Sequence, residues 1–225
     1  MPARLHVPAG SGRLPGVLLL HTLAGPGPNL ETFGRRLAAA GYVVLAPDVF
    51  ALHDFGPDGR TDHPLVVGDA RGALRHLRRH PRVAPDRIGL VGFSFGGRLA
   101  VILGALEPDG VRAIVVYYAI ASHADLPGPV APAGARAVPL AQRVPSLRAP
   151  VIIHHGEADT NVPVGQARLL HQALTDAGRP SALYLYPGAD HLFNFALGPD
   201  ARLDPEAERL SWQRTVEFLG KNLAP

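Results

Sequence analysis

The stretch IGLVGFSFGGRLA, residues 88–100, decides the fold. It begins as a short apolar run, passes through the pattern GxSxGG and continues into small and apolar residues that favour a helix. Gly92 and Gly96 flank Ser94 at a spacing that suits a sharp turn, because a Cβ at either position would crowd the neighbouring backbone. The pattern therefore predicts a nucleophile elbow, with the Ser94 hydroxyl raised above a sheet.

The same segment has two alternative interpretations. Ser94 can be a structural serine of a glycine-rich turn, and glycine-rich turns after a strand also bind dinucleotides. The fingerprint GxGxxG is not matched, however, and no acidic residue lies at a strand end about 20 positions further on. The strand before Ser94 and the helix after it favour the reactive serine.

Apolar runs bounded by glycine and proline alternate with amphipathic stretches along the chain, which is typical of βαβ units. We expect one α/β domain over residues 1–225, with a mostly parallel sheet and helices on both faces. The expected strands are residues 17–21, 42–46, 88–92, 113–118, 150–155 and 182–186. The expected helices are residues 29–40, 65–80, 95–106, 164–177 and 205–219.

The composition excludes several classes of protein. With 25 glycines and 23 prolines among 225 residues, the chain stays below the roughly 25–30% Gly plus Pro of low-complexity proteins. A net charge of +3 is too small to require a nucleic-acid partner. Residues 1–15 lack the apolar core of a signal peptide, and the early apolar run 17–20 is far short of the roughly 18 residues of a membrane span. We expect a cytoplasmic protein without membrane contact.

A serine nucleophile needs a base within hydrogen-bond reach and an acid that orients the base. The sequence contains no cysteine, so a thiolate cannot take the place of the serine. His191 follows the last expected strand on a glycine-containing loop, and Asp159 follows the strand before it. We expect Ser94, Asp159 and His191 to meet at one sheet edge, in the chain order of the α/β-hydrolase fold. Glu157 and Asp190 are the alternatives for the acid.

Two backbone amides are expected to form an oxyanion hole. Phe95 directly follows the nucleophile, and Leu23 lies in the exit loop of the first expected strand. An ordinary strand-exit turn is the alternative for Leu23. The segment 122–147 contains five prolines and no strand period, so it is expected to form either a wall or lid of the pocket or a surface loop.

These motifs resemble the dienelactone hydrolase family of α/β-hydrolases over essentially the whole chain. The matching segments are LLLH at 18–21, APDVF at 46–50, VGFSFGG at 91–97, GEAD at 156–159 and GADHLF at 188–193. The resemblance implies a compact hydrolase of small esters or lactones without a large cap domain. It also implies no metal and no organic cofactor, and it favours a monomer.

Three positions differ from the family members that cleave dienelactone. Serine stands at position 94 where those members carry cysteine, and Thr22 stands where they carry a glutamate that controls the resting thiol. The two changes agree, because a serine needs no carboxylate to manage its proton. Phe195 stands where those members carry an arginine that grips the substrate carboxylate, and Arg60 is the only candidate for a second such arginine. A substrate other than dienelactone is therefore expected.

The sequence thus predicts a serine hydrolase that cleaves small carboxylic esters or lactones through an acyl-enzyme. A non-catalytic small-molecule-binding protein with this fold is one alternative, and an acyltransferase or peptidase using the same triad is another. The pocket is expected to be apolar and aromatic, although each aromatic residue taken singly is more often part of a core than in contact with a ligand. The candidate pocket residues are Thr22, Phe93, Tyr117, Tyr118, Phe193 and Phe195.

Overall fold

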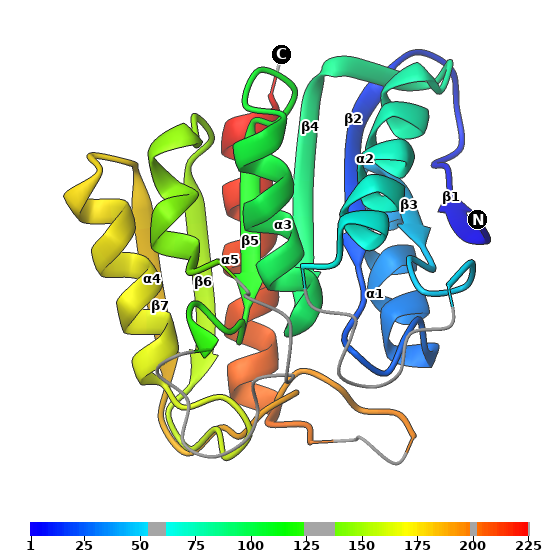
Figure 1. Ribbon diagram of the computed structural model, residues 1–225. Helices are drawn as coiled ribbons and strands as arrows, with labels where there is room; N and C mark the ends of the chain where they lie inside the picture. Colours follow the sequence, from blue (N-terminus) through cyan, green and yellow to red (C-terminus); the bar gives the residue numbers. More distant parts are fainter. Residues whose placement is uncertain (54–61, 124–137, 199–201, 225) are drawn as a thin grey trace.

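A seven-stranded sheet runs through the part of the chain that the computed structural model describes, residues 1–53, 62–123, 138–198 and 202–224. The strand order is β1-β3-β2-β4-β5-β6-β7, with β1 antiparallel to β3 and the other neighbours parallel (Figure 1). The strands are β1 (Ala3–His6), β2 (Leu14–Leu20), β3 (Val43–Pro47), β4 (Val83–Phe93), β5 (Ala113–Tyr117), β6 (Val151–Gly156) and β7 (Ser181–Tyr186).

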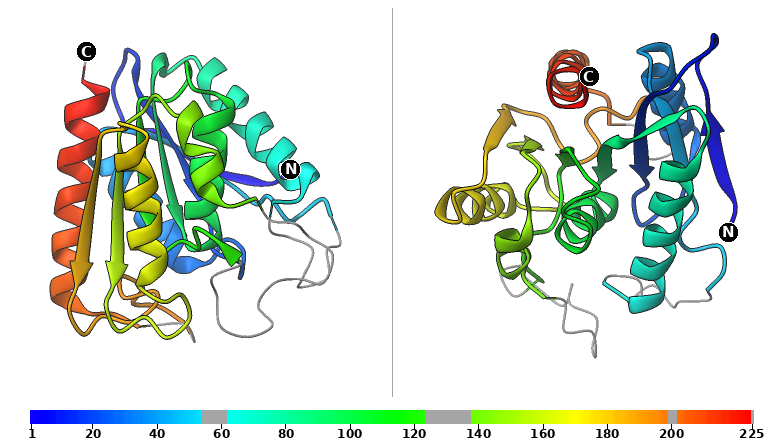
Figure 2. Two further views of the ribbon diagram at one scale, coloured as in Figure 1. Left: turned by 60° about the vertical axis from the view of Figure 1, so that its left-hand side comes forward. Right: turned by 90° about the horizontal axis from the view of Figure 1, so that it is seen from above.

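Helices cover both faces of the sheet. Seen from above in Figure 2, α1 and α5 lie on one face and α2, α3 and α4 lie on the other. Each face buries its own hydrophobic cluster against these helices. The bounds are α1 (Pro28–Ala39), α2 (Pro64–Arg79), α3 (Phe95–Leu106), α4 (Gly165–Asp176) and α5 (Pro205–Leu223), with two 3-10 turns, η2 (Leu140–Gln142) and η3 (Val144–Ser146). The predicted α/β architecture with a mostly parallel sheet is confirmed.

Strand β1 is the element that the sequence analysis missed. Its four residues pair with β3 at the sheet edge, and three of the four are exposed. An exposed edge strand needs no apolar run and shows no strict alternation, so periodicity gives no signal for it. The predicted strands and helices are all present, although β4 begins at Val83 rather than at residue 88.

Of the segment 122–147, the structure describes residues 122–123 and 138–147. Residues 124–137 lie outside the described residues, so both alternatives for them, a wall or lid of the pocket and a surface loop, stay predictions. Arg60 also lies outside the described residues. The described end forms η2 and η3, where Leu140, Val144 and Leu147 are fully buried in the cluster beneath α3 and α4. This end of the segment is part of the core. Among the described helices, none is both long and apolar enough to cross a membrane.

The turn from β4 into α3 leaves no room for a side chain at its glycines. A Cβ on Gly92 would overlap the carbonyl of Gly96, and a Cβ on Gly96 would overlap the carbonyls of Leu20 and His21 at the end of β2. Between the two glycines, Ser94 adopts a φ of 52°, which is uncommon for a non-glycine residue. The close approach of β4, α3 and β2 therefore depends on glycine at both positions and holds Ser94 in a strained conformation.

A largely buried chain of hydrogen bonds joins the sheet to α5. Its ends fix its direction, because a guanidinium only donates and a backbone carbonyl only accepts. Arg214 Nη1 donates to the Tyr186 hydroxyl (3.2 Å), which donates to His154 Nδ1 (2.8 Å). His154 Nε2 in turn donates to the Thr215 hydroxyl (3.2 Å). The Thr215 hydroxyl donates to the Tyr117 hydroxyl (2.8 Å), and the Tyr117 hydroxyl donates to the Ser211 carbonyl (3.3 Å). The chain requires a neutral imidazole, and burial, aided by the charge of Arg214, lowers the pKa of His154 to about 3.

Replacing Thr215 by valine should interrupt this chain at its middle while preserving the side-chain volume. We expect the free energy of unfolding to fall by about 1–3 kcal/mol, because buried polar groups of His154 and Tyr117 lose their partner. Urea denaturation measures the change. The control is Thr175→Val, since the Thr175 hydroxyl bonds the His171 carbonyl on an exposed face of α4. Equal losses in the two variants would contradict the importance of the buried chain.

Replacing Gly92 by alanine should disrupt the turn after β4. We expect a loss of at least about 3 kcal/mol in unfolding free energy, because the new methyl group meets rigid backbone. Gly72 in α2 provides the control, since a Cβ there meets nothing within 4 Å. Gly72→Ala should stabilise the protein by about 0.5–1 kcal/mol. Thermal and urea unfolding of both variants check this, and a well-folded Gly92→Ala protein would refute the steric argument.

Candidate active site

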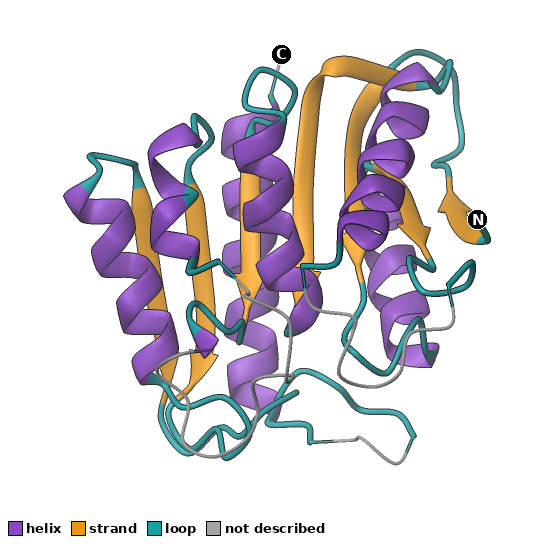
Figure 3. Ribbon diagram, in the orientation of Figure 1, coloured by secondary structure: helices purple, strands orange, loops and turns teal. Residues whose placement is uncertain are grey.

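The carboxyl ends of β4, β6 and β7 point to one edge of the sheet, the lower edge in Figure 1, and Figure 3 shows loops gathered there. These ends carry Ser94, Asp159 and His191. Ser94 Oγ lies 3.2 Å from His191 Nε2, and His191 Nδ1 lies 2.7 Å from Asp159 Oδ2. Since the carboxylate accepts, Nδ1 carries the proton and Nε2 is left to accept from the serine hydroxyl. The three residues singled out from the sequence thus form one line of hydrogen bonds.

The acid loop holds the Asp159 carboxylate in place. Its Oδ1 accepts from the backbone N–H groups of Asn161 (2.9 Å) and Val162 (2.7 Å), which leaves Oδ2 for His191. Asp159 is 8% exposed, so the carboxylate has little contact with water. Hydrogen bonds to both oxygens fix the direction of the carboxylate.

The two alternative acids have other partners. Asp190 Oδ1 accepts from the Thr160 N–H (2.9 Å), the Thr160 hydroxyl (3.1 Å) and the backbone N–H of His191 (2.7 Å). Burial alone would raise the pKa of Asp190, but these hydrogen bonds outweigh burial and lower it. Glu157 lies 3.5 Å from Arg168 at the surface. Asp190 therefore braces the histidine loop against the acid loop, and the imidazole nitrogens of His191 pair with Asp159 and Ser94.

Phe95 and Leu23 lie in the two segments that meet at the turn. Phe95 is the first residue of α3, so its amide has no acceptor within the helix and lies at the positive end of the helix dipole. Leu23 lies in a tight turn closed by the Gly25 N–H to the Thr22 carbonyl (3.1 Å). Because Gly96 touches the end of β2, this turn starts beside the elbow.

His21 connects the exits of β2 and β3, a role that the sequence analysis did not assign. It is buried, and its Nδ1 lies 2.7 Å from the Thr22 carbonyl, while the Val49 N–H donates to its Nε2 at 3.2 Å. Its ring contacts Phe50 and lies near Phe95. His21 thereby links the Thr22–Leu23 turn to the chain after β3. The only sequence signal is a histidine at the end of an apolar strand.

Arg98 is a second residue that the sequence analysis missed. It is 1% exposed, and all five N–H bonds of its guanidinium have acceptors. Nε and Nη2 meet the two oxygens of Asp62 (2.8 and 2.5 Å), Nη1 meets the carbonyls of Ile120 and Ala121 (3.2 and 3.1 Å), and Nη2 also meets the Val138 carbonyl (2.6 Å). Arg98 thus ties Asp62 and the chain at residues 120–121 and 138 to the helix that begins after Ser94.

Several candidate pocket residues lie in the hydrophobic core. Phe93, Tyr117 and Phe193 are fully buried in the cluster between the sheet and α1 and α5. Aromatic side chains suit a pocket and a core equally well, so their type alone could not separate the two. Tyr118 is also buried, but its ring meets the His191 ring edge-on at 4.7 Å.

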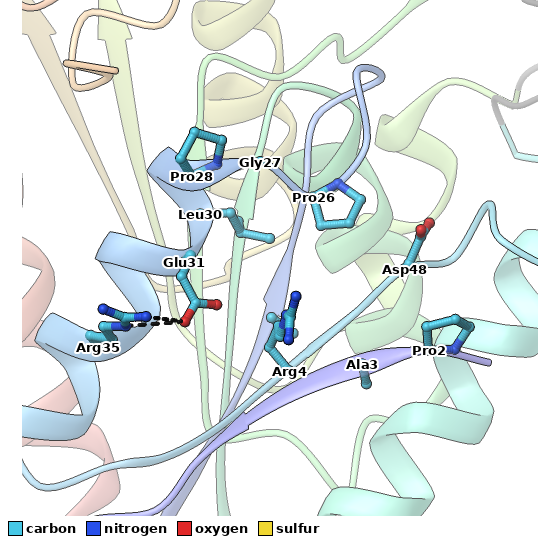
Figure 4. A pocket seen from close by; sticks show the side chains of 11 residues that line it. Pro2, Ala3, Arg4, Pro26, Gly27, Pro28, Leu30, Glu31, Arg35 and Asp48 are labelled. Carbon is cyan, nitrogen blue, oxygen red and sulfur yellow. Dashed lines mark hydrogen bonds and ion pairs between the residues drawn. The ribbon is translucent and has the colours of Figure 1, made fainter. Parts of the chain in front are cut away.

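Thr22 and Phe195 line a small cavity of about 150 Å³ beside the β2 exit loop. A larger cavity of about 750 Å³ lies between β1, α1 and the end of β3 (Figure 4). In that cavity Glu31 pairs with Arg35 at 3.0 Å. No triad residue lines either cavity, so the larger space and the triad lie at different places. Within the described residues, no group of three or more His, Asp or Glu side chains is arranged to hold a metal ion.

Comparisons with known proteins identify the family of this chain. The family model described as "Dienelactone hydrolase family" matches residues 1–223. Carboxymethylenebutenolidase of Rhodococcus opacus is 30% identical over 225 residues, covering 97% of this chain and 86% of that protein.

Solved structures share the fold. A dienelactone hydrolase-like promiscuous phosphotriesterase from metagenomic libraries is 19% identical, with a TM-score of 0.78 over 99% of both chains. Est1E from Butyrivibrio proteoclasticus is 17% identical, with a TM-score of 0.75 over 99% of this chain and 94% of that one. At these identities the likeness concerns the fold alone, whereas the match of the family model extends over nearly the whole sequence. The chain belongs to the dienelactone hydrolase family and is a hydrolase of that family.

Proposed function

We propose that the protein cleaves small carboxylic esters or lactones with Ser94 as nucleophile, His191 as base and Asp159 as the acid that orients it. The line of hydrogen bonds from Ser94 through His191 to Asp159 is the observation that supports the proposal. A hydroxyl at 3.2 Å from an imidazole nitrogen is within the range for proton transfer, and the imidazole is itself held by a carboxylate.

In the acylation step, Ser94 Oγ forms a bond to the substrate carbonyl carbon while its proton passes to His191 Nε2. The carbonyl π electrons move to the oxygen, which the amides of Phe95 and Leu23 stabilise. The tetrahedral intermediate then expels the alkoxide leaving group, which takes the proton from His191. Asp159 stabilises the imidazolium that exists between the two proton transfers.

Deacylation repeats these steps with water. His191 takes a proton from water, the hydroxide adds to the acyl carbon, and Ser94 leaves with the proton from His191. The product is a carboxylic acid, and the serine is restored. The positive φ of Ser94 and its place before α3 support this chemistry, because they direct the hydroxyl out of the turn and place it beside the helix N-terminus.

The residues beside the turn support this substrate class. Thr22 and Phe195 line the small cavity beside the β2 exit loop, and neither carries a charge. Small, uncharged acyl or lactone groups suit such a lining better than carboxylates. The relative from Rhodococcus opacus is named a carboxymethylenebutenolidase, so lactones belong beside linear esters in the first substrate panel.

Covalent labelling tests the nucleophile. We expect a fluorophosphonate probe to form one adduct per chain at Ser94, mapped by mass spectrometry, and both Ser94→Ala and His191→Ala to remain unlabelled. Ser181 is a matched control within the same chain, because its hydroxyl lies 3.0 Å from His171 Nδ1 but its position is at the start of β7. Ser181→Ala should label at the wild-type rate. A folded wild-type protein that resists the probe would favour a non-catalytic binding protein.

Product analysis tests hydrolysis against acyl transfer. With a small activated ester and a competing alcohol in water, we expect the free acid as the main product and loss of turnover in Ser94→Ala by about 10³-fold or more. Chromatography of acid and transferred ester measures the ratio. A dominant transferred ester would assign an acyltransferase with the same triad.

A further inference from the structure

His155 is a buried polar residue that the mechanism above leaves unused. It follows His154 on β6, and successive side chains of a strand point to opposite faces of the sheet. Both histidines are fully buried. His154 has hydrogen-bond partners on both ring nitrogens, whereas His155 Nδ1 is buried with no partner. A buried nitrogen without a partner costs stability, so its presence calls for an explanation.

The partner of the other nitrogen fixes the state of the ring. His155 Nε2 lies 2.8 Å from the Val162 carbonyl, which can only accept. Nε2 therefore carries the proton, and Nδ1 does not. Burial lowers the pKa of His155, and the Val162 hydrogen bond and the Asp159 charge oppose this only in part. The ring is thus a neutral imidazole that presents one N–H edge.

That N–H edge faces the triad. His155 Nε2 lies 3.4 Å from Asp159 Oδ2, the same oxygen that His191 Nδ1 approaches to 2.7 Å. Val162 joins the two residues a second time, because its N–H donates to Asp159 Oδ1 at 2.7 Å and its carbonyl accepts from His155. Asp159, Val162 and His155 therefore form a closed ring of contacts around the carboxylate.

We propose that His155 is a positioning residue of the triad, which holds the acid loop at Val162 and keeps Asp159 Oδ2 directed at His191. The proposal rests on the proposed function, since the carboxylate that it positions is the acid of that triad. It also explains the unpartnered Nδ1, because a histidine that offers its Nε2–H to the acid loop leaves Nδ1 pointing into the core. The unpartnered Nδ1 lowers the stability of the fold, and the contacts of Nε2 with Val162 and Asp159 are the reason that this loss is tolerated.

Replacing His155 by asparagine or by glutamine tests its two ring nitrogens separately. The amide nitrogen of glutamine can reach the place of Nε2, whereas that of asparagine reaches only the place of Nδ1. We expect His155→Asn to slow Ser94 labelling by the fluorophosphonate by about 10- to 100-fold, as small displacements of catalytic groups do, and His155→Gln to stay within about threefold of the wild-type rate. Rates are measured on protein that circular dichroism shows to be folded.

Destabilised variants outside the acid loop provide the control. His154→Asn removes the neighbouring buried histidine, and Thr215→Val weakens the same region should His154→Asn not fold. Both should lose stability and keep the wild-type labelling rate. If His155→Asn labels as fast as the wild type, or if the controls slow labelling equally, the positioning role is wrong.

A second readout does not depend on reactivity. The proton between His191 Nδ1 and Asp159 should give a downfield resonance in the proton NMR spectrum of the wild type and of His155→Gln. We expect the resonance to be lost in His155→Asn and retained in His154→Asn. An inert wild-type protein that shows this pattern would overturn the proposed hydrolase function while upholding the positioning role. An active protein whose resonance survives in His155→Asn would overturn the positioning role while upholding the proposed hydrolase function.

Discussion

The close approach of β4, α3 and the end of β2 is the constraint on which the rest of the site depends. Gly92 and Gly96 permit it, because neither position has room for a side-chain carbon. The turn forces Ser94 into a positive φ and places the amide of Phe95 at a helix N-terminus. It also brings the β2 exit loop beside the nucleophile. Steric exclusion thus fixes three features of the site at once, at the cost of local strain.

The acid side of the site is held in a different way. Parallel strands end at one edge of the sheet, which brings the loops after β6 and β7 near the elbow, but hydrogen bonds fix their orientation. Asp190 braces the histidine loop, the amides of Asn161 and Val162 hold one oxygen of Asp159, and His155 faces the other. The nucleophile is therefore set by packing, and the base and acid are set by a network of polar contacts.

The neighbouring histidines of β6 show how one residue type serves two purposes. Both are buried and neutral, and the alternation of the strand directs them to opposite faces. His154 completes a chain of hydrogen bonds that begins at Arg214 and ends at the Ser211 carbonyl, so it stabilises the packing of α5. His155 leaves one nitrogen unpaired and turns the other to the acid loop. His154, with a partner on each ring nitrogen, has a structural role, whereas His155, with one nitrogen unpaired, has its role beside the triad.

The amino-acid sequence alone determined the elbow, the chain order of Ser94, Asp159 and His191, and the parallel α/β architecture. These features are local in spacing or periodic in hydrophobicity, so they can be read without knowing any long-range contact. Only the tertiary structure showed that β1 completes the sheet edge, that Phe93, Tyr117 and Phe193 belong to the core, and what Arg98 and His155 contact. An apolar ring has the same composition in a core and in a pocket, and the partner of a buried polar group comes from residues far away in the chain. Burial and partnership are properties of the folded chain, and no pattern of neighbouring residues encodes them directly.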